Sequence, residues 1–420
     1  MYFLCDVHAM YPSCEQIHRP DLRHKAVAVA SNGDGLVVAL NRAARELGVK
    51  RYEPVHSQRH LFSEDKCTLF SSNYRLYQDC SLRLMRCLKS KGIFIDMADY
   101  SIDETFGELP HFIRTYDDLL SAARALRRAA WDEVRLPIGV GGGRTFTIAK
   151  VSSHIGKKVE GYRGICITLP ETESDHLKLV STSDIWNVGA STAALLRRKG
   201  IMTALDLKNV SPSDARSWMG INLERTVREL RGQAIYSMSS FPDCNTRKEV
   251  TSSLTLSVKA TTTIELHQAL SQRVATAAEK LRRLGFSAKV ITLYASSSRF
   301  DPDPQYSNTT ITLEQPTDDT RVFIAELSKH LNQLFKKGVE FNKVGCRLMS
   351  LVPSANLQGD LFAPKQSPEL MKVVDGLNQR FGSHLISIGA QKVASEAQML
   401  RRHLSPNYTT SWNDLPKITC

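Results

Sequence analysis

Two adjacent acidic residues, Asp103 and Glu104, lie inside a stretch from Asp99 to Phe106 whose composition is typical of β-structure. Neighbouring carboxylates repel each other, and a strand that packs against a core gains nothing from carrying both unless a cation lies between them. A third acid, Asp6, ends the apolar run from Tyr2 to Cys5. Two strands would therefore bring Asp6, Asp103 and Glu104 together at one edge of a sheet.

These three carboxylates form a candidate metal site. Hard oxygen ligands suit Mg²⁺, and a pair of such ions about 3.5 to 4 Å apart drives in-line phosphoryl or nucleotidyl transfer. The residues alone leave an alternative open, in which Asp103 and Glu104 form a solvated hairpin tip and Asp6 is an ordinary strand end.

The length and composition indicate several packed domains and a polyanionic partner. A chain of 420 residues suggests roughly three or four packed units. Hydrophobic residues make up 42% and charged residues 23%, which excludes a disordered protein. Lysine and arginine number 55 against 43 acidic residues, and this excess of 12 positive charges favours nucleic acid as the partner.

The cysteines and the start of the chain indicate a cytoplasmic protein. The nine cysteines are scattered without a CxxC pair, which argues against a zinc site and against a disulfide framework. The first residues carry no basic region, and no apolar run approaches the roughly 18 residues of a membrane span. We therefore expect no membrane segment.

The first half of the chain has the pattern of an α+β domain. A strand, a helix and a second strand are expected in the first thirty residues, before a tight turn at Asn32 to Gly35. The next expected elements are helices from about Ala39 to Leu47, from Tyr74 to about Lys89 with a buried stripe of Leu76, Cys80, Leu84 and Leu88, and from Asp117 to Glu133, then a strand from Pro137 to Val140, the triplet Gly141 to Gly143, and a helix through Lys150. This order predicts an antiparallel-rich sheet with helices on one face.

The second half combines a helical region with another α+β pattern. Ser181 to Gly232 is expected to be helical, and its segment with Val188 and Gly189 resembles a helix-hairpin-helix, a turn whose backbone amides bind phosphate. Asn187 replaces the usual first glycine, so an ordinary helical packing unit is the alternative. After a polar linker at residues 241–248, the pattern predicts strands at Thr251 to Lys259, Ala288 to Ser296 and Thr309 to Leu313, helices at Glu265 to Leu284 and Thr320 to Phe335, and a tail with a helix around Pro368 to Arg380 and a polar terminus.

Short motifs recur in a fixed order over nearly the whole chain. They are Cys5-Asp6-Val7 with Tyr11 and Ser13-Cys14-Glu15, Arg19-Pro20-Asp21-Leu22, Ser71-Ser72-Asn73-Tyr74, Tyr100-Ser101-Ile102-Asp103-Glu104, Gly139-Val140-Gly141, Ala149-Lys150, the run from Leu223 to Gly232, and Leu404-Ser405-Pro406 with Tyr408-Thr409-Thr410. Their order and spacing resemble those of the Y-family translesion DNA polymerases, and most closely the UmuC type.

This resemblance implies an α+β multidomain fold with the right-hand shape of a polymerase. The implied parts are a catalytic, ferredoxin-like palm of residues 1–10 and 75–168, small fingers of 11–74, a helical thumb of 169–233 with the helix-hairpin-helix, a DNA-binding α+β little-finger domain of 243–352, and a C-terminal tail of 353–420. The implied activity is error-prone synthesis opposite damaged template in the bacterial SOS response.

The resemblance also assigns roles to single residues near the acids. Asp6, Val7, Asp103 and Glu104 would hold two Mg²⁺ ions, and the three acids would be catalytic. Tyr11 falls at the steric-gate position, where its ring would exclude the 2′ hydroxyl of a ribonucleotide.

Two basic residues and the thumb turn complete the implied contacts with substrate. Arg45 and Lys150 fall where the family places cations on the incoming triphosphate. Val188 and Gly189 would contact DNA. Taken alone, either basic residue would be read as a solvated helix residue.

The tail carries a separate candidate motif. Gln358-Gly359-Asp360-Leu361-Phe362 resembles the peptide by which bacterial polymerases bind the sliding clamp, with Gln358 forming hydrogen bonds and Leu361 and Phe362 filling a pocket. A locally buried loop is the alternative. The expected partners are primer-template DNA, deoxynucleoside triphosphates, a sliding clamp, UmuD′-like subunits and a RecA filament, in the nucleoid of a bacterial cytoplasm.

Several positions depart from the UmuC pattern and affect the expected nucleotide contacts. His8, Leu40, Ala43 and Phe146 stand where asparagine, arginine, glutamate and lysine are usual, and Gly33 and Leu36 alter the finger turn. One alternative is therefore a DNA- and RecA-binding checkpoint factor with vestigial polymerase activity, which the intact acids disfavour. A two-metal nuclease is another, although a nuclease needs no sugar gate at Tyr11.

Overall fold

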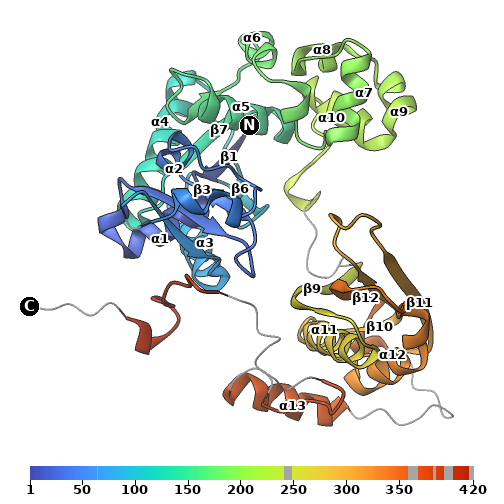
Figure 1. The fold of residues 1–420 in the computed structure, drawn as a ribbon. Helices are drawn as coiled ribbons and strands as arrows, with labels where there is room; N and C mark the ends of the chain where they lie inside the picture. Colours follow the sequence, from blue (N-terminus) through green and yellow to red (C-terminus); the bar gives the residue numbers. More distant parts are fainter. Residues whose placement is uncertain (64, 241–247, 358–367, 382–384, 392–400, 416–420) are drawn as a thin grey trace, which may run out of the picture. The chain divides into compact units, whose positions relative to one another are not determined.

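A computed structural model of the protein describes residues 1–420 except 64, 241–247, 358–367, 382–384, 392–400 and 416–420. The chain divides into two compact units (Figure 1). The first unit comprises Met1–Phe241 and Arg401–Cys420, and the second comprises Pro242–Leu400. No helix among the described residues is long and apolar enough to cross a membrane.

A five-stranded sheet forms the centre of the first unit, in the order β5-β6-β1-β7-β8. Its strands are β1 (Tyr2–Val7), β5 (Asp96–Asp99), β6 (Glu104–Glu108), β7 (Ile138–Gly143) and β8 (Ile165–Ile167). Only β7 and β8 pair in parallel, so the prediction of an antiparallel-rich sheet is confirmed.

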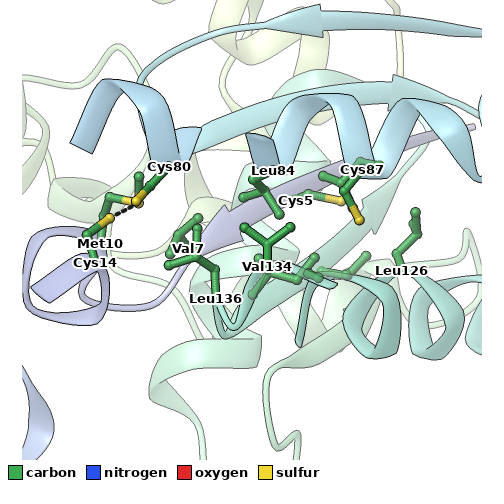
Figure 2. Close-up of a cluster of buried hydrophobic side chains, with 14 of the residues drawn as sticks. Cys5, Val7, Met10, Cys14, Cys80, Leu84, Cys87, Leu126, Val134 and Leu136 are labelled. Atoms are coloured by element: carbon green, nitrogen blue, oxygen red, sulfur yellow. Dashed lines mark hydrogen bonds between the residues drawn. The ribbon is translucent and has the colours of Figure 1, made fainter. Parts of the chain in front are cut away.

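One face of this sheet is covered by α3 (Tyr74–Ser90) and α4 (Tyr116–Ala129), which continues as a π-helical turn at Ala130–Val134. Alternate residues of β1 point to this face, and Cys5 and Val7 pack there against Leu84 and Leu126 (Figure 2). The buried stripe predicted on α3 is confirmed, because all four of its residues are buried in this core.

The opposite face is covered by α5 (Phe146–Lys158), so the expectation of helices on one face is wrong. Leu4 and Phe106 on this face pack against Phe146. A Cβ atom at Gly141 would lie 2.2 Å from the backbone nitrogen of Ser153, so only glycine lets α5 approach so closely. The glycine triplet is therefore part of β7 instead of following it.

A second, three-stranded sheet follows β1 in sequence. Its order is β3-β2-β4, with β2 at Ala26–Ala30, β3 at Val37–Leu40 and β4 at Cys67–Ser71. The neighbouring helices are α1 (Met10–His18) and α2 (Arg42–Glu46). The helix predicted from about Ala39 is wrong at its start, because Ala39 and Leu40 pair with β2, and Asn41 caps α2 by accepting a hydrogen bond from the Ala44 amide.

The region expected to be helical forms five short helices. They are α6 (Glu173–Lys178), α7 (Ala190–Arg198), α8 (Ala204–Asn209), α9 (Pro212–Met219) and α10 (Ile221–Leu230). Among the described residues, 3₁₀ helices form at Pro20–Leu22, His56–Leu61, Thr182–Asp184, Met238–Ser240, Ser354–Asn356 and Trp412–Asp414.

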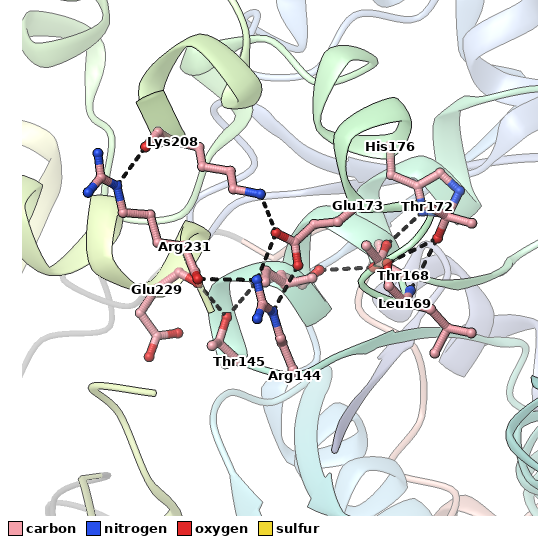
Figure 3. Close-up of polar contacts among 12 residues, drawn as sticks. Arg144, Thr145, Thr168, Leu169, Thr172, Glu173, His176, Lys208, Glu229 and Arg231 are labelled. Carbon is pink, nitrogen blue, oxygen red and sulfur yellow. Dashed lines mark hydrogen bonds and ion pairs between the residues drawn. The ribbon is translucent and has the colours of Figure 1, made fainter. Parts of the chain in front are cut away.

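Ion pairs to one buried carboxylate connect these helices to Arg144, just before α5 (Figure 3). Glu173 is 2% exposed and accepts hydrogen bonds from Arg144 at 2.9 and 3.0 Å and from Lys208 at 2.6 Å. Gly232 has a φ of +82°, and a Cβ there would lie 1.9 Å from Cζ of Arg144. The segment that ends at Gly232 thus packs directly on the side chain of Arg144, which binds Glu173.

The second unit confirms the predicted α+β pattern. Its antiparallel sheet has the order β11-β10-β12-β9, formed by β9 (Glu249–Ala260), β10 (Phe286–Ser296), β11 (Tyr306–Thr317) and β12 (Phe341–Pro353). Two helices, α11 (Thr263–Arg283) and α12 (Thr320–Leu334), pack on it. The predicted tail helix is α13 (Pro368–Phe381), whose Asp375 accepts two hydrogen bonds of 2.7 Å from Arg282.

The end of the chain belongs to the first unit instead of forming only a polar terminus. Leu404 forms a parallel bridge with Ser71 at the end of β4. The predicted linker at residues 241–248 lies almost wholly outside the described residues. The division into palm, fingers, thumb and little finger remains a prediction.

Candidate active site

The acidic stretch at Asp99 to Phe106 is a hairpin. Strand β5 ends at Asp99 and β6 begins at Glu104, so Asp103 is the last residue of the tip. The amides of Tyr100 and Ser101 both donate to the backbone oxygen of Glu104 at 3.0 Å, which closes the turn.

Strand pairing brings the three predicted acids to the same end of the sheet. Asp6 and Glu104 are directly opposite residues of the antiparallel pair β1 and β6. The amide of Val7 donates to the backbone oxygen of Asp103 at 2.9 Å. Opposite residues of an antiparallel pair point to the same face, so Asp6 and Glu104 point to the face that α5 covers.

Two lysines of α5 bind these carboxylates. Lys150 Nζ lies 3.0 Å from both carboxylate oxygens of Glu104. Lys157 forms an ion pair with Asp6, and the Asp103 carboxylate accepts a hydrogen bond from the Ser101 hydroxyl. Lys157 was not predicted from the sequence, although its position two helical turns after Lys150 was a usable signal.

Asp6 and Glu104 thus each face a lysine, while Asp103 faces the Ser101 hydroxyl. Within the described part of the chain, no group of three or more histidine, cysteine, aspartate or glutamate side chains is gathered closely enough to hold a metal ion. The donor set still suits a hard divalent cation, because three carboxylates lie at neighbouring backbone positions at one end of the sheet. A shared ion requires the lysines to release the acids.

Burial shifts the pKa values of two residues at this end of the sheet, Asp6 and His8. Burial raises the pKa of Asp6 to about 6, while Lys157 opposes the shift and the charges of Glu104 and Asp103 add to it. Burial lowers the pKa of His8 to about 4, so this imidazole is neutral at pH 7. Such a crowded acidic cluster favours a bound cation.

Aromatic rings enclose Lys150. Its ammonium lies 4.2 Å from the ring centroid of Tyr100 and 5.5 Å from that of Trp186. The indole nitrogen of Trp186 donates to the Tyr100 hydroxyl at 2.9 Å. These contacts restrict Lys150 to a position beside Glu104. The part of Trp186 in this arrangement was not predicted from the sequence.

Tyr11 lies on α1 and is partly exposed. Its ring stacks on Tyr77, with centroids 4.5 Å apart and planes at 14°, and it meets Tyr74 edge to face. Burial, together with the nearby charges of Tyr74 and Asp103, raises the pKa of Tyr11. The ring therefore lies within electrostatic range of the acidic hairpin.

The remaining predicted residues lie farther along the chain. Arg45 is exposed on α2. Val188 is buried and Gly189 is the N-cap of α7, while Asn187 takes the φ of +67° that the usual glycine would adopt. The clamp-binding candidates Gln358, Leu361 and Phe362 lie outside the described residues.

Three of the departures from the UmuC pattern occupy apolar sites. Phe146 is fully buried and stacks on Phe106 with ring centroids 4.3 Å apart. Leu40 is 6% exposed in the core under β3, and Ala43 packs against the same core. A charged side chain at position 146 would be desolvated here, so this site favours an apolar residue.

Comparisons with known proteins agree with this geometry. The impB/mucB/samB family matches residues 5–154, its C-terminal domain matches 247–361, and a domain of unknown function, DUF4113, matches 368–418. Protein UmuC of Salmonella typhimurium is 34% identical over 100% of both chains. A DNA polymerase IV of Corynebacterium diphtheriae is 28% identical over 54% of this chain and 49% of its own.

The solved structures show the same fold. The Y-family DNA polymerase chimera Dbh-Dpo4(243-245)-Dbh matches with a TM-score of 0.67 and 17% identity, covering 84% of this chain and 99% of that one. Fold, full-length identity and family matches agree. The chain therefore belongs to the impB/mucB/samB family and is a UmuC-type DNA polymerase of the Y family.

Proposed function

We propose that this polymerase adds deoxynucleotides to a primer 3′ end by a two-metal mechanism centred on Asp6, Asp103 and Glu104, with Val7 completing the metal site. Synthesis across damaged template in the SOS response is the activity of the UmuC type. Two bound Mg²⁺ ions would supply activation of the primer hydroxyl and neutralisation of charge on the triphosphate.

The residues of α5 have a defined part in this proposal. Lys150 and Lys157 neutralise the carboxylates while no cation is bound, which stabilises an otherwise repulsive cluster. Once released, the same ammonium groups lie beside the acids and bind the negative charge of the triphosphate. Arg45 is proposed as a further triphosphate contact.

Tyr11 is proposed as the sugar gate. Its ring is held flat against Tyr77, so it presents a fixed surface under the sugar of an incoming nucleotide. A 2′ hydroxyl would meet that surface, and a deoxyribose would not. The substrates are therefore primer-template DNA and deoxynucleoside triphosphates, and the excess of 12 positive charges favours DNA binding.

Other parts of the proposal rest on likeness to the family. Val188 and Gly189 would bind the DNA backbone, and Gln358, Leu361 and Phe362 would bind the sliding clamp. UmuD′-like subunits and a RecA filament are the proposed protein partners, in a bacterial cytoplasm. Neither the geometry nor the comparisons favour the alternative of a checkpoint factor with vestigial activity.

The register of Asp6 opposite Glu104 carries the proposal, because it joins acids that are 98 positions apart at one end of the sheet. The test is primer extension past an abasic site with Mg²⁺. Glu104→Gln should abolish extension, while the control Asp96→Asn, at the exposed other end of the same hairpin, should extend like the wild type. Undiminished extension by Glu104→Gln would refute the assignment.

A further inference from the structure

Residues 401–415 form a strap across the first unit. The amide of Ser71 donates to the His403 carbonyl at 2.9 Å, and the amide of His403 donates to the Ser71 hydroxyl at 3.0 Å. The ring of Tyr408 stacks on His18, with centroids 4.7 Å apart and planes at 18°. The strap is thus joined both to the end of β4 and to α1.

Ser405 is the buried centre of the strap and is 4% exposed. Its hydroxyl donates to Oε1 of Glu15 at 3.0 Å and accepts from the side-chain amide of Asn73 at 3.1 Å. Asn73 also caps α3 by accepting from the Leu76 amide. One hydroxyl therefore connects the strap to both α1 and the start of α3.

Glu15 extends this connection toward the gate. Its carboxylate is fully buried, and Oε1 also accepts a hydrogen bond of 2.7 Å from the Tyr77 hydroxyl. Tyr77 is fully buried too, and the Tyr11 ring lies flat on it. Contacts are thus unbroken from Ser405 through Glu15 and Tyr77 to Tyr11.

We propose that Ser405 is a positioning residue for sugar selection: by binding Glu15 it fixes Tyr77, and Tyr77 fixes the ring of Tyr11. This inference rests on the gate role given to Tyr11 under the proposed function. Ser405 lies in the segment that matches DUF4113, so this inference gives part of that segment a role in the polymerase reaction. Ser405 and Glu15 are 390 residues apart in the chain and meet only in the folded protein.

The physical basis is the precision that a steric gate needs. A ring excludes a 2′ hydroxyl only if it stays within a fraction of an ångström of its place, and misplacement by about 1 Å changes rates up to about a hundredfold. Tyr77 provides the flat surface for Tyr11, and its own hydroxyl donates to the carboxylate that Ser405 also binds. Loss of either hydroxyl leaves that carboxylate with one donor fewer.

The experiment measures discrimination between deoxynucleotides and ribonucleotides by the full-length protein. The readout is the ratio of the two kcat/KM values, supported by competition of dATP and ATP for a complex on a dideoxy-terminated primer. The variants are Ser405→Ala, Tyr77→Phe, Glu15→Gln and Tyr11→Ala. Ser411→Ala is the matched control on the strap, because the Ser411 side chain does not cap the following helix.

Ser405→Ala and Tyr77→Phe should each lower discrimination about fivefold, the effect of one net hydrogen bond. Glu15→Gln should retain discrimination because its amide oxygen still accepts both hydrogen bonds, and Ser411→Ala should match the wild type. A purely structural role would lower both kcat/KM values in proportion.

Unchanged discrimination in Ser405→Ala and Tyr77→Phe, or a proportional loss of both activities, would overturn the inference. If Tyr11→Ala admits ribonucleotides while Ser405→Ala and Tyr77→Phe keep the wild-type discrimination, only this inference fails. If Tyr11→Ala also keeps wild-type selection, the gate role in the proposed function fails with it.

Discussion

The ammonium of Lys150 lies 3.0 Å from both carboxylate oxygens of Glu104, although the two residues are 46 positions apart. By resemblance to the family, the lysine was expected to bind the triphosphate and the glutamate to hold metal. The structure joins them because β6 and α5 meet on one face of the sheet. We therefore propose two functions for the lysine, to neutralise Glu104 while no cation is bound and to bind the triphosphate when cations replace it.

Removal of Lys150 should weaken nucleotide binding. Lys150→Ala should raise the KM for deoxynucleoside triphosphates about tenfold, because a hydrogen bond to a charged group contributes about 1.5–3 kcal/mol. Steady-state insertion kinetics on a primed template measure this change. Lys158→Ala, an exposed lysine at the end of the same helix, is the control and should keep the wild-type KM. An unaltered KM in Lys150→Ala would exclude the lysine from substrate binding.

Glu15 should make the stability of the first unit depend on pH. Burial raises the pKa of its carboxyl from 4.5 to about 7, against the hydrogen bonds from Tyr77 and Ser405, with smaller contributions from Cys80, which raises it, and His18, which lowers it. Between these two values the folded state retains a proton that the unfolded chain releases. The free energy of unfolding should therefore fall by up to about 3 kcal/mol as the pH rises from 4.5 to 7.

Urea unfolding followed by tryptophan fluorescence measures this dependence. All four tryptophans lie in the first unit, at Trp131, Trp186, Trp218 and Trp412. Glu15→Gln cannot titrate and should flatten the pH dependence by the stated amount. The same slope in the variant and the wild type would contradict the assignment to Glu15.

Glu173 should be a main source of stability between α5 and the short helices. Glu173→Ala leaves the partly exposed Arg144 and Lys208 without their shared carboxylate, and losing hydrogen bonds between charged groups costs about 1.5–3 kcal/mol. The same fluorescence measurement at pH 7 gives the loss. Glu171→Ala, two residues earlier and exposed, should unfold like the wild type. Equal stability of the two variants would show that the network in Figure 3 contributes little.

Periodicity and turn residues were enough to predict much of the fold. The stripe on α3 and the first strand, helix and strand were predicted because each depends on local patterns. The predicted helix from Ala39 failed because pairing with β2 overrides the helix propensity of alanine and leucine. Gly141 was placed after the predicted strand and not in it, because the close approach of α5 that requires glycine is a tertiary contact.

The candidate site could be predicted only where local sequence patterns indicated it. Asp103 and Glu104 stood out as adjacent acids inside a β-type stretch and Asp6 as the end of an apolar run, and the structure pairs Asp6 with Glu104. Lys157 and the contact between Ser405 and Glu15 were missed, because each joins segments that are distant in sequence. Only the folded arrangement of α5 and of the strap brings these pairs together.

The most direct test of the two-metal site is to count the bound metal ions. Mn²⁺ replaces Mg²⁺, and electron paramagnetic resonance measures how many Mn²⁺ ions bind the protein together with primer-template and a non-hydrolysable deoxynucleotide. The wild type should bind two ions, the control Asp96→Asn should do the same, and Asp103→Asn should lose at least one of them. Full binding of both ions by Asp103→Asn, or by a variant that also carries Asp6→Asn and Glu104→Gln, would contradict the account.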